Sequence, residues 1–207
     1  MTYRLTHLSR ALALGAALAC FGGCVPLMVG GAVMGGLVAT DRRTSGTVVE
    51  DEGIELKAAA RIRENLGQRV HVNVTSYNRQ VLLTGEVPSA QDKQLIEQAV
   101  LQTENVRNVV NELDVLGSST LTQRSSDTVV TGRVKAALLD AKDLFSNSFK
   151  IVTERGTTYV MGRVTQREAN RATDIITSTQ GVQKVVRVLE IISEEELARM
   201  LPVPAKN

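Results

Sequence analysis

The chain has 207 residues, of which 43% are hydrophobic and 3% aromatic, and it contains no tryptophan. Its 24 Lys and Arg residues exceed its 22 Asp and Glu residues by two. This balance lacks the basic footprint that bulk nucleic-acid binding requires, and the scarcity of aromatic side chains argues against a platform for stacked bases.

The N-terminus has the layout of a secretory signal peptide. Arg4 and Arg10 supply positive charge, residues 11–21 form an uncharged apolar run, and two glycines precede Cys24. A cationic region, an apolar region and small residues before a cleavage site are typical of exported proteins. We therefore expect residues 1–23 to be a signal peptide. Their removal would leave 22 basic and 22 acidic residues.

Cys24, as the first residue after this cut, resembles the lipobox cysteine of bacterial lipoproteins. The resemblance implies cleavage before Cys24, diacylation of its sulfur and acylation of its new amine. Two or three acyl chains hold a protein durably on a membrane, because each buried methylene contributes about 0.8 kcal/mol. Val25 follows the cysteine where an aspartate would imply retention in the inner membrane. The expected location is the outer membrane, lipid-anchored and facing the periplasm.

Two alternatives remain for this segment. Cys20 could be the modified residue, or residues 11–39 could form an uncleaved membrane helix. The second alternative has the necessary length, since these residues carry no charge and a membrane span needs about 20. However, seven glycines and Pro26 fall within this stretch, and both residue types weaken the prediction of a helix there.

Residues 24–46 are predicted to be the lipidated N-terminus and a flexible tether. The part before position 40 is apolar and rich in glycine, and a polar stretch with Arg42 and Arg43 follows. These two arginines could contact lipid phosphates. Neighbouring acidic residues offset their charge, so a solvated linker is the preferred interpretation.

The rest of the chain contains an internal repeat. Residues 72–76 recur 77 positions later as 149–153, and residues 82–87 recur as 159–164. Each unit reads as helix, strand, strand, helix, strand, and a helix between the last two strands suits a crossover in a mixed sheet. The predicted fold is α+β, with two tandem αββαβ domains, each a three-stranded mixed sheet packed against two helices. The predicted boundaries are 47–116 for the first domain, 117–125 for a linker, 126–192 for the second domain and 193–207 for a short C-terminal helix and tail.

Apolar positions at helical spacing predict which faces are buried. The first helix of each unit should bury such a stripe, and the second helix should begin at a capping residue, Ser89 or Thr165. Gly85 and Gly162 are expected where close packing excludes a side chain. The residues expected to face the core from the helices are Ala58, Ile62, Leu66, Leu95, Ile96, Ala99, Val100, Val130, Val134, Ala137, Leu138, Ala141, Ala169, Ala172 and Ile176.

Two αββαβ units of about 70 residues, each with an apolar-Thr/Met-Gly-x-Val segment and a Val-x-x-Val-Val run, resemble BON domains. Together with the lipobox and the short glycine-rich tether, they resemble the dual-BON outer-membrane lipoproteins. This resemblance extends from the lipobox to about residue 192. It implies a protein that supports outer-membrane integrity and whose second BON domain binds phospholipid.

The sequence offers no credible catalytic set, cofactor site or metal site. His71 is the one histidine after Cys24, and its place on the polar side of a strand favours a surface residue over a general base. Neither a second histidine nor a cysteine pair is present to complete a triad or a zinc site. We therefore expect a protein that is not an enzyme.

The remaining candidate surface is the first helix of the second unit. Val129 lies beside the buried stripe, and Arg133 and Lys135 add positive charge. An exposed apolar residue beside cations suits docking into anionic phospholipid headgroups, and the family resemblance implies the same helix. The resembled lipoproteins carry a tryptophan where this chain has Val129.

The alternative is a periplasmic scaffold or regulator that binds an envelope assembly factor or protease, with no direct headgroup recognition. Envelope protein partners are compatible with both interpretations, and the sequence leaves the oligomeric state open.

Overall fold

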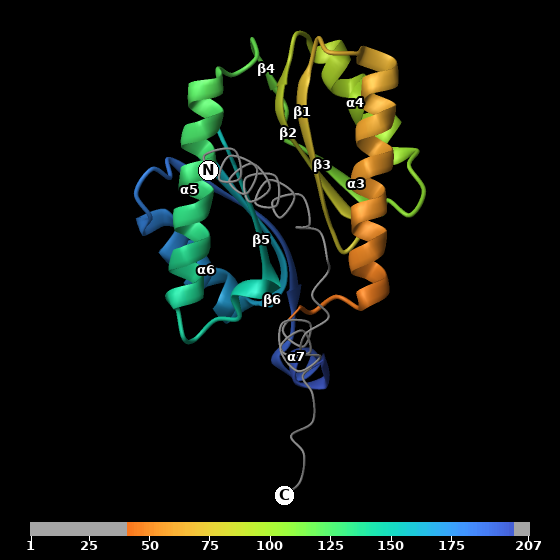
Figure 1. Ribbon diagram of the computed structural model, residues 1–207. Helices are drawn as coiled ribbons and strands as arrows, with labels where there is room; N and C mark the ends of the chain where they lie inside the picture. Colours follow the sequence, from red (N-terminus) through yellow and green to blue (C-terminus); the bar gives the residue numbers. More distant parts are fainter. Residues whose placement is uncertain (1–40, 201–207) are drawn as a thin grey trace, which may run out of the picture. The chain divides into compact units, whose positions relative to one another are not determined.

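The computed structural model describes residues 41–200, and the predictions made for Cys24 and the C-terminal tail lie outside this range. The described residues belong to one compact unit. The described part of this unit contains two modules with the predicted order of helix, strand, strand, helix, strand (Figure 1). None of its helices is both long and apolar enough to span a membrane.

Module 1 is built from α3 (Ser45–Leu66), β1 (His71–Tyr77), β2 (Gln80–Val87), α4 (Ala90–Leu101), β3 (Asn108–Asn111) and β4 (Asp114–Val115). β1 pairs antiparallel with β2, and β2 pairs in parallel with β3 and β4. The third strand of the expected sheet is therefore split in two. The break follows Asn111. The side-chain amide of Asn111 donates hydrogen bonds to the Lys93 carbonyl oxygen and to the Glu97 carboxylate, both in α4.

Module 2 repeats this order with α5 (Leu121–Asp140), a 3₁₀ turn η2 (Ser146–Ser148), β5 (Phe149–Glu154), β6 (Thr157–Thr165), α6 (Gln166–Ser178) and β7 (Lys184–Ile192), followed by α7 (Glu194–Met200). β5 and β6 are antiparallel, and β6 and β7 are parallel along nine register pairs. The mixed sheet predicted for each unit is therefore confirmed, with strand order β1-β2-β3 in module 1 and β5-β6-β7 in module 2.

The first helix of each module begins before the predicted domain boundary, which was residue 47 for module 1 and residue 126 for module 2. α3 begins at Ser45 because the Thr44 hydroxyl accepts a hydrogen bond from the Thr47 N–H. α5 begins at Leu121, inside the segment expected to be a linker, because Thr120 and Gln123 form a reciprocal capping box. Both caps satisfy backbone N–H groups that would otherwise have no partner at a helix N-terminus.

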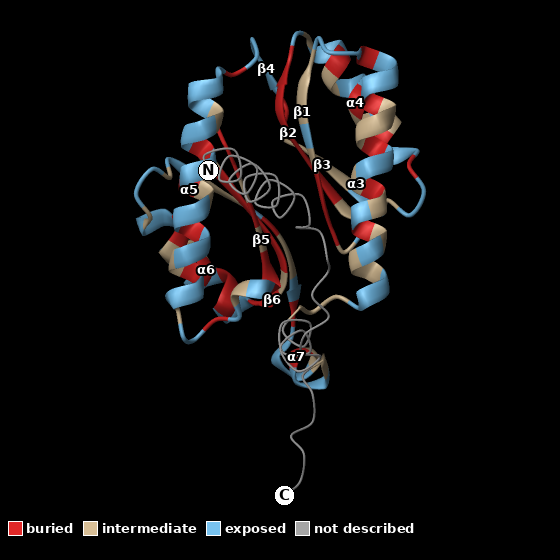
Figure 2. Ribbon diagram, viewed as in Figure 1, coloured by how far each residue is buried: buried red, intermediate tan, exposed pale blue. Residues whose placement is uncertain are grey.

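Each module has a core between its helices and one face of its sheet, as the buried stripes on the helices show (Figure 2). The predicted residues Ala58, Ile62 and Leu66 of α3 are buried, as are Val130, Val134 and Leu138 of α5. The prediction was wrong for Leu95, which is 43% exposed. Ile96 and Val100 of α4 are buried as predicted, and Leu95 precedes this stripe by one residue.

A third apolar cluster lies between the two sheets. Tyr77 and Leu82 of module 1 pack with Tyr159, Met161 and Val188 of module 2. These residues project from the sheet faces opposite the helices, because neighbouring strand residues alternate between faces. Both faces of each sheet are thus covered, and the eight residues of β2 include seven that are buried.

The two glycines predicted at close approaches are confirmed in that role. A Cβ atom on Gly85 would lie 2.2 Å from the His71 carbonyl oxygen, and one on Gly162 would lie 2.4 Å from the Ser148 oxygen. Gly85 also has φ of 115°, which favours glycine. The second strand of each module can therefore approach the start of the first strand only without a side chain at this point.

Candidate functional site

The three residues expected to contact lipid all lie on α5. Val129 is 52% exposed, and Arg133 and Lys135 are also exposed, whereas Val130 and Val134 face the core of module 2. Arg133 is held loosely, with one guanidinium nitrogen 3.4 Å from the Gln180 carbonyl oxygen. The exposed side of α5 thus presents both cations and an apolar side chain to the surroundings.

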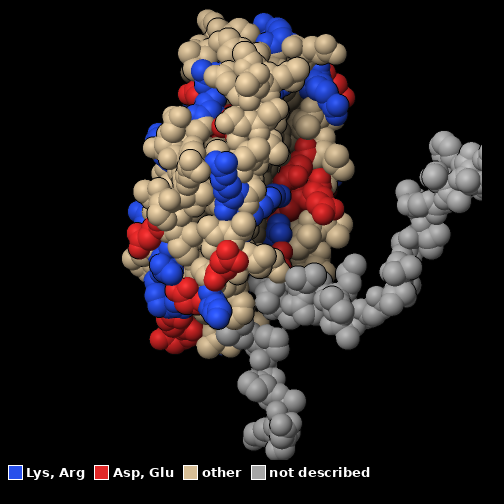
Figure 3. Space-filling model, turned by 60° about the vertical axis from the view of Figure 1, so that its left-hand side comes forward, with Lys and Arg blue, Asp and Glu red and all other residues tan. Residues whose placement is uncertain are grey.

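The exposed side of α5 is more apolar than the sequence analysis recognised. Leu121 is 80% exposed and Leu139 is 72% exposed. The spacing of the exposed residues Leu121, Gly132 and Leu139, at i, i+11 and i+18, places them along one line of the helix. Val129 lies beside this line. Arg133 and Lys135 stand on either side of it. Figure 3 shows the molecule turned toward this side, with basic and acidic groups scattered among uncharged residues.

A hollow of about 620 Å³ lies next to Val129 and Arg133. Its opposite wall includes Arg155 and Gly156, in the turn between β5 and β6. Both of these residues have positive φ, and the buried Asp127 carboxylate accepts their backbone N–H groups at 2.8 and 2.9 Å. α5 therefore fixes the turn that borders the hollow.

The corresponding helix of module 1 has a different character. The sequence of α3 contains five acidic and three basic residues, whereas α5 contains three basic and two acidic residues. α3 does share the turn-binding device, since Asp51 accepts hydrogen bonds from the N–H groups of Asn78 and Arg79. The two helices therefore share this device but differ in the sign of their net charge.

Residues 41–43 are bound to the folded modules, contrary to the expectation of a solvated linker. The Arg42 guanidinium makes two hydrogen bonds of 2.7 and 2.6 Å to the Glu168 carboxylate of α6 and donates to the Arg163 carbonyl oxygen. Its side chain is 4% exposed. We call residues 41–43 the strap. Because Glu168 lies 126 positions from Arg42 in the chain, no local sequence pattern indicates the strap.

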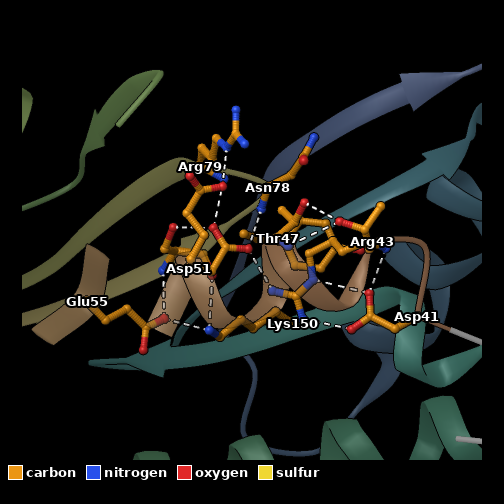
Figure 4. Close-up of polar contacts among 12 residues, drawn as sticks. Asp41, Arg43, Thr47, Asp51, Glu55, Asn78, Arg79 and Lys150 are labelled. Atoms are coloured by element: carbon orange, nitrogen blue, oxygen red, sulfur yellow. Dashed lines mark hydrogen bonds and ion pairs between the residues drawn. The ribbon is translucent and has the colours of Figure 1, made fainter. Parts of the chain in front are cut away.

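Arg43 extends the strap to module 1. Its guanidinium hydrogen-bonds Asp41 and Asp51 and lies 4.3 Å from the centre of the Tyr77 ring (Figure 4). Burial, with a further contribution from Asp41, raises the pKa of Tyr77 to about 12. Neither Arg42 nor Arg43 is free to contact lipid phosphates in this arrangement, so that alternative for the two arginines was wrong.

Polar contacts also cross directly between the two modules. Lys150 of β5 donates to Glu55 of α3 at 2.6 Å and to the Ser76 carbonyl oxygen at 3.1 Å (Figure 4). Asn78 donates to Glu190 of β7. The modules are therefore joined both by the apolar cluster between the sheets and by these polar contacts.

His71 lies within this interface and is not the solvated surface residue that was expected. Its Nδ1 atom is 2.9 Å from Glu86 Oε2, and its side chain is 18% exposed. Burial opposes ionisation of Glu86, yet hydrogen bonds from His71 and the Ser119 N–H hold the pKa of Glu86 below its usual range. The alternation of residues along β1 predicted correctly that His71 lies on the polar face of the strand. It could not predict that the sheet of module 2 covers this face.

The same cluster contains Glu154, at the end of β5. One potential ligand atom from each of His71, Glu86 and Glu154 lies within 4.8 Å of those from the other two. Glu154 accepts a hydrogen bond of 2.8 Å from the Asn73 amide. Burial raises the pKa of Glu154, and the nearby Glu86 carboxylate raises it further.

Comparison with known proteins agrees with this architecture. The model of the BON domain family matches residues 50–117 and again residues 126–193. The chain is 34% identical over 172 residues to the outer membrane lipoprotein DolP of Haemophilus influenzae, covering 82% of this chain and 89% of that protein. It is 27% identical over 154 residues to a 21 kDa hemolysin of Actinobacillus pleuropneumoniae, covering 73% of this chain and 79% of that protein.

Among solved structures, the C-terminal domain of CdsD, a type III secretion protein of Chlamydia trachomatis, aligns with a TM-score of 0.29 at 12% identity. That alignment covers 65% of this chain and 96% of the solved chain, and its low score supports no inference. The two family matches together cover well over half of the chain and coincide with the two modules. The chain therefore belongs to the BON domain family and is a dual-BON protein similar to DolP.

Proposed function

We propose that this protein is a lipid-anchored component of the bacterial envelope whose second BON module binds anionic phospholipid and thereby supports outer-membrane integrity. The similarity to a protein named as an outer membrane lipoprotein supports the location. Cys24, in its lipobox-like setting, is the proposed site of acylation. The role is one of binding and requires no catalytic group. The folded modules would face the periplasm.

The exposed face of α5 carries this proposal. Val129 and its apolar neighbours Leu121 and Leu139 would enter the boundary between headgroups and acyl chains, while Arg133 and Lys135 would remain at the level of the lipid phosphates. Such a division suits a helix lying in the plane of a membrane surface. Each basic residue near an anionic surface contributes about 1 kcal/mol, so two of them matter when the inserted apolar area is small.

Sedimentation with vesicles tests this proposal without the contribution of the acyl anchor. A fragment of residues 41–207 retains the strap and both modules, and it should sediment with phosphatidylglycerol vesicles but not with phosphatidylcholine vesicles. The double variant R133E/K135E should bind at least about 30-fold more weakly, since it loses two favourable contributions of about 1 kcal/mol each.

The double variant R61E/R63E is the matched control, because it makes the same change in net charge on α3. It should retain near-normal binding if α5 is the contact. Equal loss in both variants, or no loss in R133E/K135E, would contradict headgroup binding by α5. Acylation is tested separately by the intact mass of the N-terminal peptide, which should begin at Cys24 and carry the acyl chains.

The substitution Val129→Trp should strengthen binding to the same vesicles. An indole ring is favourable at a membrane interface because its apolar body can be buried while its N–H remains near water. Titration of vesicles monitored by tryptophan fluorescence should show a blue shift, since the chain has no other tryptophan. An emission spectrum that stays unchanged at saturating lipid would place this residue away from the bilayer.

A second candidate function, a scaffold for an envelope protein, is favoured by the edge of the module 2 sheet. β7 is nine residues long and pairs with β6 on one side of the described sheet, and Ile191 on it is 49% exposed. An edge of this length can accept a partner strand. Cross-linking in cells with R133E/K135E would separate the functions, because only the scaffold function predicts partner capture that is unaffected by loss of lipid binding.

A further inference from the structure

The cluster of His71, Glu86 and Glu154 joins three strands from two modules. His71 and Glu86 are register partners in the antiparallel pair of β1 and β2, so their side chains project from the same sheet face. Glu154 reaches the cluster from the last residue of β5. Three groups that are commonly metal ligands, one imidazole and two carboxylates, thus come together only when the modules pack.

The cluster contains more buried negative charge than its immediate contacts balance. The Glu86 side chain is 0% exposed, and Glu154 as a residue is 8% exposed. Besides His71, the basic side chain that contacts Glu86 is Arg155, at 3.3 Å and with 31% of its side chain exposed. Glu154 is contacted by a neutral amide, that of Asn73. Two neighbouring buried carboxylates strongly favour either a proton or a cation between them.

A buried hydroxyl without a hydrogen-bond partner lies on the same sheet face. Thr84 is 1% exposed, and its Oγ1 atom makes no hydrogen bond. It is two residues from Glu86 on β2 and opposite Asn73 in the β1–β2 register, so it shares their face. A buried polar atom of this kind is costly unless a further group, such as an ordered water, pairs with it.

The cluster is also accessible from outside. A hollow of about 340 Å³ is lined by His71, Asn73 and Glu154 and, on the α5 side, by Thr128 and Thr131. It is large enough to admit a hydrated ion and to retain water molecules beside the cluster. Two of the three groups, His71 and Glu154, thus border the hollow directly, which would leave one coordination position open to water.

We propose that His71, Glu86 and Glu154 form a binding site for a divalent transition-metal ion, best matched by Zn²⁺, at the junction of the two BON modules. The ligands are His71 Nδ1 and one oxygen from each carboxylate, and water from the hollow completes a tetrahedron. Nδ1 and Glu86 Oε2 are 2.9 Å apart and share a hydrogen bond, which coordination of the metal would replace. A neutral ring would bind the metal as the tautomer protonated on Nε2, and a ring protonated on both nitrogens would release its Nδ1 proton to solvent.

Groups around the ligands are arranged to support this coordination. The Ser119 N–H donates to Glu86 Oε2, and Arg155 donates to Oε1, so both oxygens of Glu86 are oriented. Asn73 does the same for Glu154. Hydrogen bonds to ligating carboxylates are typical of metal sites. Because the ligands come from both modules, the bound ion would hold them together, and this site is independent of lipid binding by α5.

Calorimetric titration of the acylated full-length protein in detergent, after treatment with a chelator, tests the proposal with ZnCl₂ as the probe. We expect one Zn²⁺ per chain and a higher melting temperature when it binds. Glu154→Gln preserves the size of the side chain and its contact with Asn73, and it should weaken Zn²⁺ binding by about 100-fold or more. His71→Ala should abolish binding. Mg²⁺ at the same concentration should not raise the melting temperature.

Glu190→Gln is the matched control, because Glu190 also contacts the other module but lies outside the cluster. It should bind Zn²⁺ like the unaltered protein. Co²⁺ provides a second measurement, since a tetrahedral site gives visible absorption bands that Glu154→Gln should remove even if that variant is less stable. The proposal is overturned if Zn²⁺ produces no saturable heat, or if His71→Ala and Glu154→Gln bind it as tightly as Glu190→Gln does.

Discussion

Arg42 illustrates how one buried ion pair can fasten a segment to a folded body. Its guanidinium and the Glu168 carboxylate are almost completely buried, with exposed side-chain fractions of 4% and 2%. Desolvation of two charges offsets much of their attraction, so the pair itself adds little net stability. Removal of one partner is different, because it leaves the other charge buried without compensation.

We therefore predict that Arg42→Ala lowers the free energy of unfolding by about 3 kcal/mol. Lys57→Ala is the comparison, since Lys57 pairs with Glu104 at the surface and is 57% exposed. Its loss should change stability far less, because solvent screens an exposed pair. Chemical denaturation of both variants checks the difference, and equal effects would mean that the strap is not held as described.

The strap should also respond to pH. Burial opposes ionisation of Glu168, but the Arg42 guanidinium overcomes this and holds the pKa of Glu168 below its usual range. Such a carboxylate contributes stability above its unfolded pKa, about 4.3, and loses it as pH falls through the lower folded pKa. The stability difference between the unaltered protein and Glu168→Gln should be largest at neutral pH and vanish in acid. A difference that is constant from pH 7 to pH 2 would contradict this origin.

Residue-level prediction from the sequence succeeded where neighbours in the chain determine the outcome. The buried stripe through Val130 and Val134 follows from helical spacing, and so does the exposure of Val129. Prediction failed for Arg42, which pairs with Glu168, and for His71, which lies beside Glu154, because both of these acidic residues come from module 2. Asp127 was missed although a signal existed, since Asp51 and Asp127 both stand just before the apolar stripe of the first helix of each module.

At the level of elements, Gly85 determines how β2 can pair with β1. Its φ of 115° and the 2.2 Å approach of the His71 oxygen both exclude a Cβ atom. Gly85→Ala should therefore cost at least about 3 kcal/mol through clash and backbone strain. Gly53→Ala in α3 should instead stabilise by about 1 kcal/mol, because nothing lies within 4 Å of the new methyl group. Thermal denaturation of the two variants should show shifts of opposite sign.

The order and type of the elements could be predicted because the repeat presents each pattern twice. The boundaries were less accurate where a cap determines them, as at Thr120, or where a side chain interrupts a strand, as at Asn111. The capping box of Thr120 and Gln123 was not predicted, because the segment around it is rich in Ser and Thr, a composition typical of linkers.

For the whole molecule, the shared apolar cluster and the cross-module ion pairs predict cooperative unfolding. Residues 41–200 should melt in a single calorimetric transition whose van't Hoff and calorimetric enthalpies agree. The double variant Leu82→Ala/Met161→Ala removes packing from the shared cluster while leaving each helix–sheet core intact, and it should separate the transition into two.

Leu56→Ala is the control for this comparison, because Leu56 is 73% exposed on α3. It should keep the single transition. Two well-resolved transitions in the unaltered protein would show that the modules unfold independently. The apolar run at residues 81–83 is typical of a strand buried on both faces, but such a run does not identify the surface that covers the second face, so the coupling itself could not be predicted.

Equivalent positions of the two repeats differ in charge. Glu86 in module 1 corresponds to Arg163 in module 2 at the 77-residue offset. Glu86 pairs across the interface with Arg155, whereas Arg163 pairs with Glu190 and Glu196 of module 2, so the two copies no longer carry the same polar groups. Cut away from module 2, the first unit would present Tyr77 and Leu82 to water, and it should self-associate or aggregate. The duplication works as an internal dimer, and the chain already occupies the surface that a lone unit would use to oligomerise.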